Sequence, residues 1–304
     1  MSYLTPIVLF VYNRPEHTRR TLAALAANPL AIDSDLIIYA DGPKKPEHAT
    51  SVSATRAIVR AATGFKSISL VERDENFGLA RSIIQGVTEV CNASGRVIVL
   101  EDDIVVVPEF LSYMNRALDQ YAPDEKAMQI SGYMFPVSHP EELPESFFSS
   151  LPTSWGWATW RRAWDSFEID AKTLLNQLKP GDITSFDLDG QFAYSQMLKD
   201  QSRGVLDVWG VRWYASMFLK GGLCLYPSYS LVSNIGMDGS GVHCGPSDAY
   251  DVSLTEKVPA RFPEEISVSE IGEAKIREFF RTQRGSILKR LLIGLKQSLV
   301  KLIH

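Results

Sequence analysis

The chain has 304 residues, of which 45% are hydrophobic and 22% charged, an ordinary composition for a soluble globular protein with a packed core. Its formal net charge is −5, which argues against a nucleic-acid partner, because such a partner requires a basic face. We find no secretory signal segment, no apolar run near the ~18 residues of a membrane span and no CxxC pair, so we expect a cytoplasmic protein with reduced thiols.

Strand-like and helix-like segments alternate over residues 1–132. The predicted strands cover residues 4–12, 35–40, 67–71 and 97–100. Each is followed by a segment of helical composition, and the predicted helices cover residues 15–27, 47–62, 77–91 and 108–121. Alternation of this kind predicts an α/β fold with a mostly parallel central sheet and helices on both faces.

The second half of the chain has a different character, since all six tryptophans lie between Trp155 and Trp213. Residues 136–152 contain several prolines, acids and serines, which predicts a long surface loop at the join between the halves. Trp157, Trp160 and Trp164 recur at helical spacing and predict a helix that packs a tryptophan stripe into the core.

The fourth predicted strand stops at three consecutive carboxylates, Glu101, Asp102 and Asp103, which we call the acidic triplet. Acids at the end of a buried strand repel one another and are costly to desolvate unless a cation lies among them. Mg²⁺ or Mn²⁺ is the expected cation, because both prefer oxygen ligands and share them with substrate phosphates. The alternative is a strand that ends in solvated acids.

Polar residues also follow the other three predicted strands. They are Asn13 and Arg14, then Asp41 and Gly42, then Arg73, Asp74 and Asn76. Ligands of open α/β sheets bind beyond the carboxyl ends of the strands, so these residues and the acidic triplet predict a pocket for a charged, nucleotide-like ligand. The sequence contains neither a glycine-rich dinucleotide fingerprint nor a P-loop, which leaves side chains and a metal to hold the nucleotide.

Four segments carry a resemblance to a known family: Val11-Tyr12-Asn13-Arg14-Pro15, Asp41-Gly42, Asn76-Phe77-Gly78-Leu79-Ala80-Arg81 and Glu101-Asp102-Asp103. In order and spacing they resemble the nucleotide-sugar-dependent glycosyltransferases of the GT-A type, particularly family 2-like bacterial enzymes of surface-polysaccharide biosynthesis. The resemblance implies a GT-A (Rossmann-like) fold. It also implies that Asp41 recognises the base, that Asp103 holds the metal, and that Asp102 reaches the ribose or assists with the metal.

The resemblance also implies a division of labour along the chain. Residues 1–132 would bind the nucleotide sugar, and residues 133–270 would bind the acceptor within the same GT-A unit. A metal held by the acidic triplet would neutralise the leaving diphosphate, and Arg14, Arg73 and Arg81 could add bidentate contacts to phosphate oxygens. Arg81 could instead pair with a nearby acid.

Two features of the second half suggest contacts with sugars. Trp155 or Trp157 could stack on a pyranose ring, with core packing as the alternative for either. Asp207 is the leading candidate for the base of an inverting transfer. It precedes Trp209-Gly210-Val211-Arg212-Trp213, which is similar to the Gln-x-x-Arg-Trp element of family 2 enzymes except that Trp209 stands where that element has Gln. Asp207 could equally cap the helix that carries Arg212, and Asp165 and Glu168 are alternative bases.

The last segments add two further expectations. Residues 234–243 form a glycine-rich stretch that ends at His243, and by resemblance this histidine completes the metal site; a structural histidine is the alternative. Residues 271–304 predict a C-terminal amphipathic helix, and from residue 281 onward the chain has six basic residues and no acid. Such a helix could contact an anionic membrane surface peripherally or dock on the body through its leucines.

The sequence as a whole therefore predicts a metal-dependent hexosyl- or N-acetylhexosaminyl-transferase. The donor would be a nucleotide sugar, expected to be UDP-linked, and the acceptor a saccharide or lipid-linked saccharide. Two alternatives stay open. One is a sugar nucleotidyltransferase, whose usual glycine-rich N-terminal loop is absent, and the other is a non-catalytic saccharide-binding or assembly protein.

Overall fold

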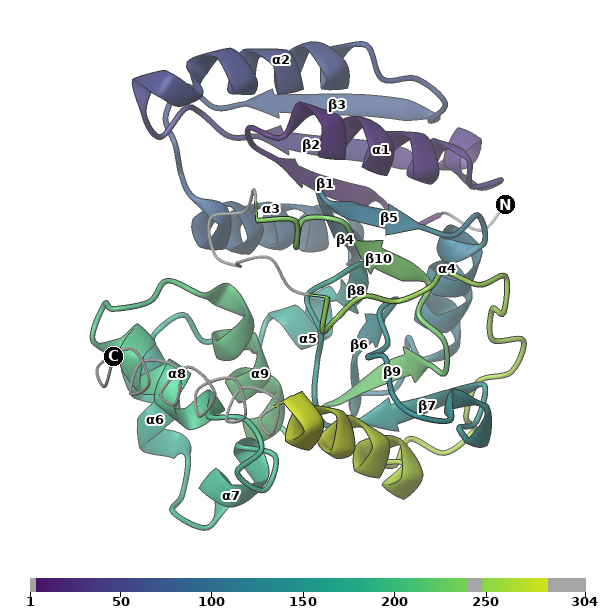
Figure 1. Cartoon of the computed structure of the whole chain (residues 1–304), viewed down its shortest axis with the longest axis vertical. Helices are drawn as coiled ribbons and strands as arrows, with labels where there is room; N and C mark the ends of the chain where they lie inside the picture. Colours follow the sequence, from purple (N-terminus) through teal and green to yellow (C-terminus); the bar gives the residue numbers. More distant parts are fainter. Residues whose placement is uncertain (1–3, 240–247, 284–304) are drawn as a thin grey trace, which may run out of the picture.

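The computed structural model describes residues 4–239 and 248–283 of the chain. A single sheet runs through this part of the protein, with eight strands in the order β3-β2-β1-β4-β8-β6-β9-β7 (Figure 1). The strands are β1 (Ile7–Val11), β2 (Asp35–Ala40), β3 (Ser67–Glu72), β4 (Arg96–Glu101), β6 (Ala127–Ser131), β7 (Ser146–Ser149), β8 (Trp157–Trp160) and β9 (Leu223–Pro227). A separate antiparallel pair joins β5 (Ile104–Val106) to β10 (Val232–Asn234).

The sheet is mostly parallel. Strands β3, β2, β1 and β4 are all parallel neighbours, and so are β6 and β9. Strand β8 is antiparallel to both β4 and β6, and β7 is antiparallel to β9 at the edge. Because β4 and β8 pair directly, strands from both predicted halves of the chain belong to one continuous sheet.

Helices pack against both faces of the sheet. The α-helices are α1 (Pro15–Ala26), α2 (Ala49–Arg60), α3 (Leu79–Ser94), α4 (Phe110–Gln120), α5 (Arg161–Trp164), α6 (Ala171–Gln177), α7 (Asp182–Phe186), α8 (Tyr194–Ser202) and α9 (Trp209–Leu219). Short 3₁₀ turns are η1 (Ala31–Asp33), η2 (Pro46–His48) and η3 (Pro140–Glu142), and a further helix covers residues 270–283. Helices α1 and α2 contact each other, while α3 contacts α5 and α9. The predicted α/β class with a mostly parallel central sheet is therefore confirmed.

Local sequence explains where the first elements begin and end. Pro15 occupies the first turn of α1, where its missing N–H costs no hydrogen bond. Gly95 ends α3 in the left-handed conformation (φ 76°), and its N–H donates to the carbonyl of Cys91 at 2.8 Å. All five residues of β1 are buried, as expected for a parallel strand covered on both faces.

Two predictions for the second half are wrong. The predicted loop at residues 136–152 contains the buried edge strand β7, which packs Phe147 and Phe148 into the core. Residues 157–160 form the strand β8 rather than a helix. Their tryptophans lie on opposite faces of the sheet: Trp157 stacks on Trp209 of α9, whereas Nε1 of Trp160 donates to the carbonyl of Leu118 in α4. Side chains three positions apart on a strand, such as Trp157 and Trp160, point to opposite faces of the sheet. Because both faces are covered here, both tryptophans are buried, and their three-residue spacing resembled that of a helix by chance.

The strand order creates a crevice at one edge of the sheet. The chain moves from β1 to β2 to β3 in one direction and then returns to β4 on the other side of β1. Connections that leave two neighbouring parallel strands in opposite directions open a space beyond their carboxyl ends. The residues that follow β1 and β4 therefore border a natural binding site.

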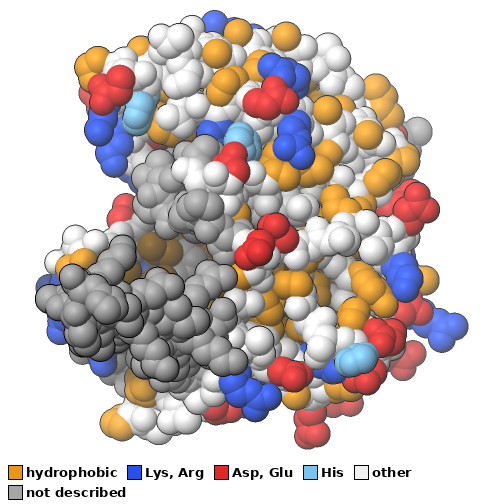
Figure 2. All heavy atoms as spheres, in the orientation of Figure 1, with side chains coloured by type: hydrophobic (Ala, Val, Ile, Leu, Met, Phe, Trp, Pro, Cys, Tyr) orange, Lys and Arg blue, Asp and Glu red, His pale blue; other side chains and the backbone are white. Residues whose placement is uncertain are grey.

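The surface bears on the predicted partners. Figure 2 shows one face of the molecule, where Lys and Arg side chains are interspersed with Asp and Glu side chains. Within residues 4–239 and 248–283, no helix is long and apolar enough to cross a membrane. The cytoplasmic location and the lack of a nucleic-acid partner stay predictions, and most of the basic tail lies outside the described residues.

Candidate functional site

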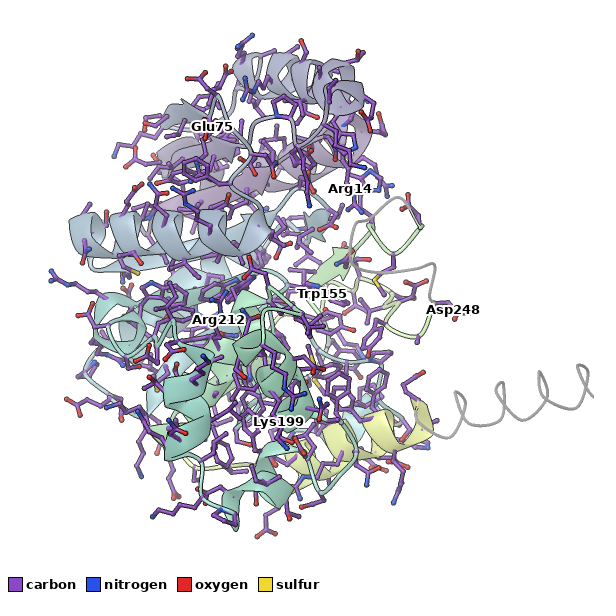
Figure 3. The ribbon with its side chains drawn as sticks, turned by 90° about the vertical axis from the view of Figure 1, so that its left-hand side faces the viewer. Arg14, Glu75, Trp155, Lys199, Arg212 and Asp248 are labelled. Atoms are coloured by element: carbon purple, nitrogen blue, oxygen red, sulfur yellow. The ribbon has the colours of Figure 1, made fainter. Side chains whose placement is uncertain are left out.

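A cavity of about 400 Å³ opens at the carboxyl ends of β1, β2 and β4. One side, which we call the strand-end wall, is lined by Tyr12, Asn13, Arg14, Asp41, Lys44, Asn76 and the acidic triplet. The other side, which we call the tryptophan wall, is lined by Ser154, Trp155, Asp207, Val208 and Trp209. In Figure 3, Arg14 comes from the upper, N-terminal part of the chain, and Trp155 and Arg212 come from the part below it. The cavity thus lies between residues far apart in sequence.

A second cavity of similar volume, about 420 Å³, lies elsewhere, between Asp189 and the helix of residues 270–283. Two of its three basic side chains are paired: Lys275 with Glu142, and Arg277 with both Asp189 and Glu273; the third is Arg281. Five charged residues line it, against seven at the cavity at the strand ends.

The acidic triplet lies beside the first strand, with Asp102 buried and Glu101 and Asp103 partly buried. Asp102 is 8% exposed; its Oδ2 accepts a hydrogen bond from the N–H of Tyr12 at 3.2 Å, and its carbonyl accepts one from the Thr21 hydroxyl at 2.9 Å. Burial, followed by repulsion from Asp103 and Asp102, raises the pKa of Glu101 well above its usual value. Burial and the charge of Asp103 raise the pKa of Asp102 to about 7. Burial also raises the pKa of Asp103, although Arg14 opposes the rise.

These carboxylates have the character of a site for a hard cation. Oδ1 of Asp103 is buried and accepts no hydrogen bond from the described residues. Oδ2 of Asp103 accepts from Nη1 of Arg14 at 2.7 Å. In the described part of the chain, no three His, Cys, Asp or Glu side chains converge as a complete metal cage. One or two carboxylates without a cage suit Mg²⁺ or Mn²⁺, because these ions take further ligands from water and substrate phosphates.

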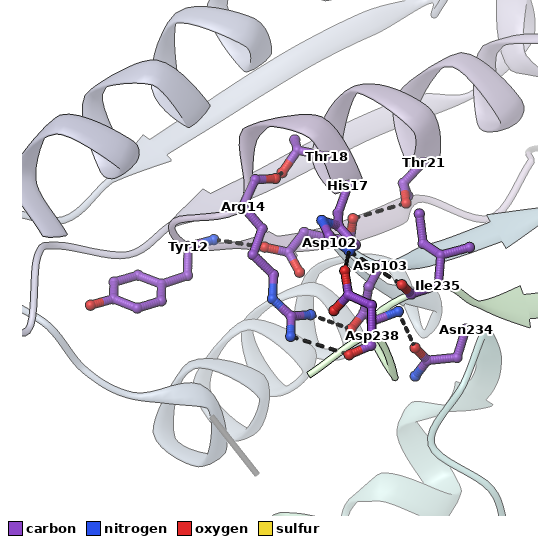
Figure 4. Close-up of polar contacts among 11 residues, drawn as sticks. Tyr12, Arg14, His17, Thr18, Thr21, Asp102, Asp103, Asn234, Ile235 and Asp238 are labelled. Carbon is purple, nitrogen blue, oxygen red and sulfur yellow. Dashed lines mark hydrogen bonds and ion pairs between the residues drawn. The ribbon is translucent and has the colours of Figure 1, made fainter. Parts of the chain in front are cut away.

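A short segment of the second half contacts Asp103 and the start of α1 (Figure 4). The N–H of Ile235 donates to the carbonyl of Asp103 at 2.9 Å, and Nη2 of Arg14 approaches the carbonyl of Gly236 at 3.4 Å. His17 of α1 contacts the carbonyl of Ile235 and the carboxylate of Asp238, each at 3.2 Å. Residues 234–238 are thereby attached to the start of α1 and to Asp103. His243, the predicted third metal ligand, lies outside the described residues.

Asp41, which by resemblance would recognise the base, lines the cavity, and its own loop donates hydrogen bonds to its carboxylate. Its Oδ1 accepts from the N–H groups of Gly42 and Phe77, at 3.0 and 2.8 Å. Its Oδ2 accepts from the N–H of Gly78 at 2.9 Å and from Nδ2 of Asn76 at 3.0 Å. A carboxylate has about four acceptor positions, so Asp41 keeps little capacity for a nucleobase. It lines the cavity and fixes the loop that leads into α3.

Two of the three predicted phosphate-binding arginines do not line the cavity. Arg73 is 7% exposed; its guanidinium lies 4.3 Å from the ring centre of Phe77, and its Nη1 donates to the Ser82 hydroxyl. Burial lowers the pKa of Arg73. Arg81 is exposed, and its guanidinium lies 3.8 Å from the ring centre of Phe77. Both arginines are therefore held by an aromatic ring instead, and Arg14 remains the guanidinium at the cavity.

The two candidate sugar-stacking tryptophans have separate positions. Trp155 is partly buried and lines the cavity, and the rings of Tyr133 and Tyr250 meet it edge-on at centroid distances of 4.5 and 5.8 Å. Trp157 is 0% exposed and stacks on Trp209 at 5.1 Å. The prediction that Trp157 contacts a sugar is corrected accordingly: it is a core residue, and its partner Trp209 lines the cavity.

Asp207 stands at the mouth of the cavity. Its side chain is 71% exposed, and its Oδ1 accepts from Nη2 of Arg212 at 3.0 Å. The N-cap of α9 is Val208, so the helix-cap alternative for Asp207 does not hold. Neither of the other two candidate bases is among the residues that line the cavity. Asp165 pairs with Arg161, and Glu168 accepts from the N–H of Asp170.

Some cavity residues were not predicted from the sequence. Lys44 lines the cavity, and its N–H donates to the hydroxyl of Tyr12 at 2.9 Å. The same hydroxyl lies 2.6 Å from Nδ1 of His48, which fixes the Tyr12 side chain. Asn234 and Gly236 also line the cavity, from the segment after β10. The nearest sequence signal for Lys44 was its position just after Asp41-Gly42, at the end of a predicted strand.

Comparisons with known proteins give only distant likenesses. No protein-family model matches the chain, and no curated protein matches its sequence. Among solved structures, glucosyl-3-phosphoglycerate synthase from Mycobacterium tuberculosis, in complex with Mn²⁺, UDP and glucosyl-3-phosphoglycerate, is 14% identical with a TM-score of 0.33, over 57% of this chain and 59% of its own. Mouse xyloside xylosyltransferase 1, in its apo form, is 12% identical with a TM-score of 0.35, over 70% of this chain and 80% of its own. The chain thus spans less than two thirds of the first of these proteins, and its function has to be inferred from its own site.

Proposed function

We propose that this protein is a glycosyltransferase that moves a sugar from a nucleotide-sugar donor, expected to be UDP-linked, to a saccharide or lipid-linked saccharide with the help of Mn²⁺ or Mg²⁺. The observation that carries the proposal is the composition of the cavity. The acidic triplet, in which Oδ1 of Asp103 accepts no hydrogen bond from the described residues, faces a wall that offers the aromatic ring of Trp155 and the exposed carboxylate of Asp207. Diphosphate, sugar ring and acceptor hydroxyl each need one of these groups.

The charges of the cavity favour a metal ion. Its acidic side chains are Asp41, Asp207 and the acidic triplet, and its basic side chains are Arg14 and Lys44. A diphosphate would be repelled by this excess of carboxylates unless a divalent cation accompanied it. When bound, the metal would supply charge neutralisation for the leaving diphosphate. Asp103, assisted by Asp102 or Glu101, would hold it.

In the proposed reaction, Asp207 acts as the base of an inverting transfer. The acceptor oxygen forms a bond to the anomeric carbon, the bond from that carbon to the diphosphate oxygen breaks, and the hydroxyl proton goes to Asp207. Arg212 supports this role, because its guanidinium holds Oδ1 of Asp207 and leaves Oδ2 to meet the hydroxyl. Trp155 would present its face to the apolar side of a pyranose ring.

The two walls suggest how the binding tasks are divided. Residues 1–132 supply the strand-end wall and would bind the nucleotide, while Trp155, Asp207 and Trp209 in residues 133–270 would meet the acceptor. Residues 234–238 are the exception, because they belong to the second stretch but contact Arg14 and Asp103. Whether the basic tail reaches a membrane stays a prediction.

The first test is calorimetric titration of UDP into the protein with Mn²⁺, repeated with EDTA. We expect binding that requires the metal. If another nucleoside diphosphate such as GDP, ADP, CDP or dTDP binds in place of UDP, the reaction class stands and the donor changes. If none binds with Mn²⁺, the transferase proposal fails and a saccharide-binding protein becomes the better explanation.

Turnover is tested with the Asp207→Asn variant. We expect transfer, or slow metal-dependent hydrolysis of the nucleotide sugar, to fall by roughly 10²-fold or more, with UDP–Mn²⁺ affinity unchanged, because a positioned base contributes on that order. Asp165→Asn is the matched control, since Asp165 is an exposed carboxylate away from the cavity. Equal activity of the two variants would remove Asp207 from the mechanism, and no hydrolysis by the unaltered protein would favour a pure binding protein.

A further inference from the structure

Arg14 lies where a cation is expected. Its Nη1 donates to Oδ2 of Asp103 at 2.7 Å, and its Nη2 approaches the carbonyl oxygen of Gly236 at 3.4 Å (Figure 4). The side chains of Arg14 and Asp103 are only 15% and 13% exposed. The guanidinium is therefore a partly desolvated counter-charge on the same carboxylate that would hold the metal.

The packing around this pair leaves little free space. A Cβ added to Gly236 would lie 2.0 Å from Oδ2 of Asp103 and 2.5 Å from Nη1 of Arg14. A divalent ion bound at about 2.1 Å from a carboxylate oxygen of Asp103 would lie within a few ångströms of the guanidinium. Like charges at that separation repel strongly in a partly buried site. Arg14 and a metal ion cannot both occupy Oδ2 of Asp103 without cost.

Arg14 has another partner available once a nucleotide enters. It lines the same cavity as Asn13 and the acidic triplet, and its backbone is fixed at the start of α1, where its carbonyl accepts from the N–H and the hydroxyl of Thr18 at 3.0 and 2.8 Å. A guanidinium on a fixed backbone can turn to a diphosphate and bind it with two parallel hydrogen bonds.

We propose that Arg14 makes metal binding depend on the nucleotide: it occupies Asp103 in the free protein and transfers to the donor diphosphate when the metal–nucleotide complex binds. This inference rests on the proposed function, because it needs both a metal and a diphosphate at the cavity. The ion pair at Oδ2 of Asp103 supports it, since this oxygen is not open to a metal ion while Arg14 donates to it. The protein should therefore bind the ion alone and the diphosphate alone weakly, and the complex of the two tightly.

The alternative is that the Arg14–Asp103 pair only stabilises the fold. A purely structural pair would lower the free energy of unfolding when broken and would leave the coupling between metal and nucleotide unaltered. Coupling is the factor by which UDP raises Mn²⁺ affinity, and it equals the factor by which Mn²⁺ raises UDP affinity. It is therefore the readout that separates the two roles.

The test measures Mn²⁺ binding to the full chain by electron paramagnetic resonance of the free ion, with and without UDP, corrected for Mn²⁺–UDP formed in solution. Arg14→Gln should bind Mn²⁺ alone on the order of tenfold more tightly than the unaltered protein, because it removes a cation from the ligand. The same variant should bind UDP–Mn²⁺ more weakly. The coupling factor therefore falls, because Mn²⁺ affinity rises without UDP and decreases with UDP.

Arg19→Gln is the matched control, because Arg19 lies on the same helix and pairs with Glu16 at the surface. Arg14→Lys, which keeps the charge but not the bidentate fork, should leave Mn²⁺ affinity low and weaken only the nucleotide complex; it also serves if Arg14→Gln does not fold. Unchanged or weaker Mn²⁺ affinity in a folded Arg14→Gln protein that still binds UDP–Mn²⁺ overturns this inference alone. If the unaltered protein binds no nucleoside diphosphate with Mn²⁺, the proposed function and this inference fail together.

Discussion

Asp41 and Asp103 are two carboxylates at the same edge of one sheet, and they differ in how many hydrogen bonds the protein donates to them. Both follow parallel strands and both line the cavity. Asp41 accepts four hydrogen bonds from its own loop and the start of α3. One oxygen of Asp103 accepts from Arg14, and the other is buried and has no donor among residues 4–239 and 248–283. A satisfied carboxylate supports the structure, whereas an unsatisfied one can receive a ligand.

The difference arises from the backbone around each acid. The loop after β3 turns back toward Asp41, so consecutive N–H groups of Phe77 and Gly78 point at its carboxylate. Gly42 allows this close approach, because a Cβ there would lie 2.5 Å from the backbone of Glu75. Asp103 lies between β4 and β5, whose backbone groups pair with neighbouring strands and leave few donors for a side chain.

The largest expected effect is that of Asp103→Asn on ligand binding. The amide keeps the shape of the side chain and an acceptor for Arg14 but loses the charge that would hold a metal. We expect UDP–Mn²⁺ affinity to fall about 100-fold or more, which corresponds to a loss of ~2.7 kcal/mol. The free energy of unfolding should stay the same or rise, because one of three crowded acids loses its charge. Calorimetry and urea unfolding measure the two quantities.

An Asp103→Asn protein that is clearly less stable, yet binds UDP–Mn²⁺ normally, would contradict this assignment. Asp103 would then be a structural acid like Asp41, and the comparison between the two sites would collapse. The same substitution at Asp41 therefore provides the matched test.

Asp41→Asn should mainly change stability. One carboxylate oxygen is replaced by an NH₂ group, which faces N–H donors that it cannot accept from. Leaving two N–H groups around this buried carboxylate without a partner should lower the free energy of unfolding by about 2–4 kcal/mol. Urea unfolding at neutral pH measures the loss. If instead stability is kept and only nucleotide binding disappears, Asp41 contacts the base directly, as the resemblance implied.

The strand-end wall was largely predictable from the sequence, because its residues come directly after apolar runs that can only be buried strands. Asn13, Arg14, Asp41, Asn76 and the acidic triplet all line the cavity. Their division into satisfied and unsatisfied groups was not predictable. It depends on which loop N–H groups point at which oxygen, and residue types do not record that.

The tryptophan wall was much less predictable. Trp155 and Trp157 are two residues apart around Gly156, and nothing in their sequence says that one lines the cavity while the other is fully buried. Gly156 has a φ of 58°, which turns the chain between them. Insertion of the antiparallel strand β8 between β4 and β6 is a long-range choice that pairs residues ~60 positions apart. Local patterns cannot encode a pairing of that kind.

The smallest expected effect, and the finest test of the comparison, is that of Asn76→Ala. Nδ2 of Asn76 donates to Oδ2 of Asp41 at 3.0 Å and to the carbonyl of Gly42 at 2.8 Å, so this amide helps to hold Asp41. Its loss removes one of four donors to Asp41, and we expect the free energy of unfolding to fall by about 1 kcal/mol. UDP–Mn²⁺ affinity should fall only a few-fold, through a looser loop. If Asn76→Ala lowers UDP–Mn²⁺ affinity as much as Asp103→Asn does and leaves stability unchanged, Asn76 binds the nucleotide itself. Asn76 would then be a ligand-binding residue like Asp103 and not only a support for Asp41.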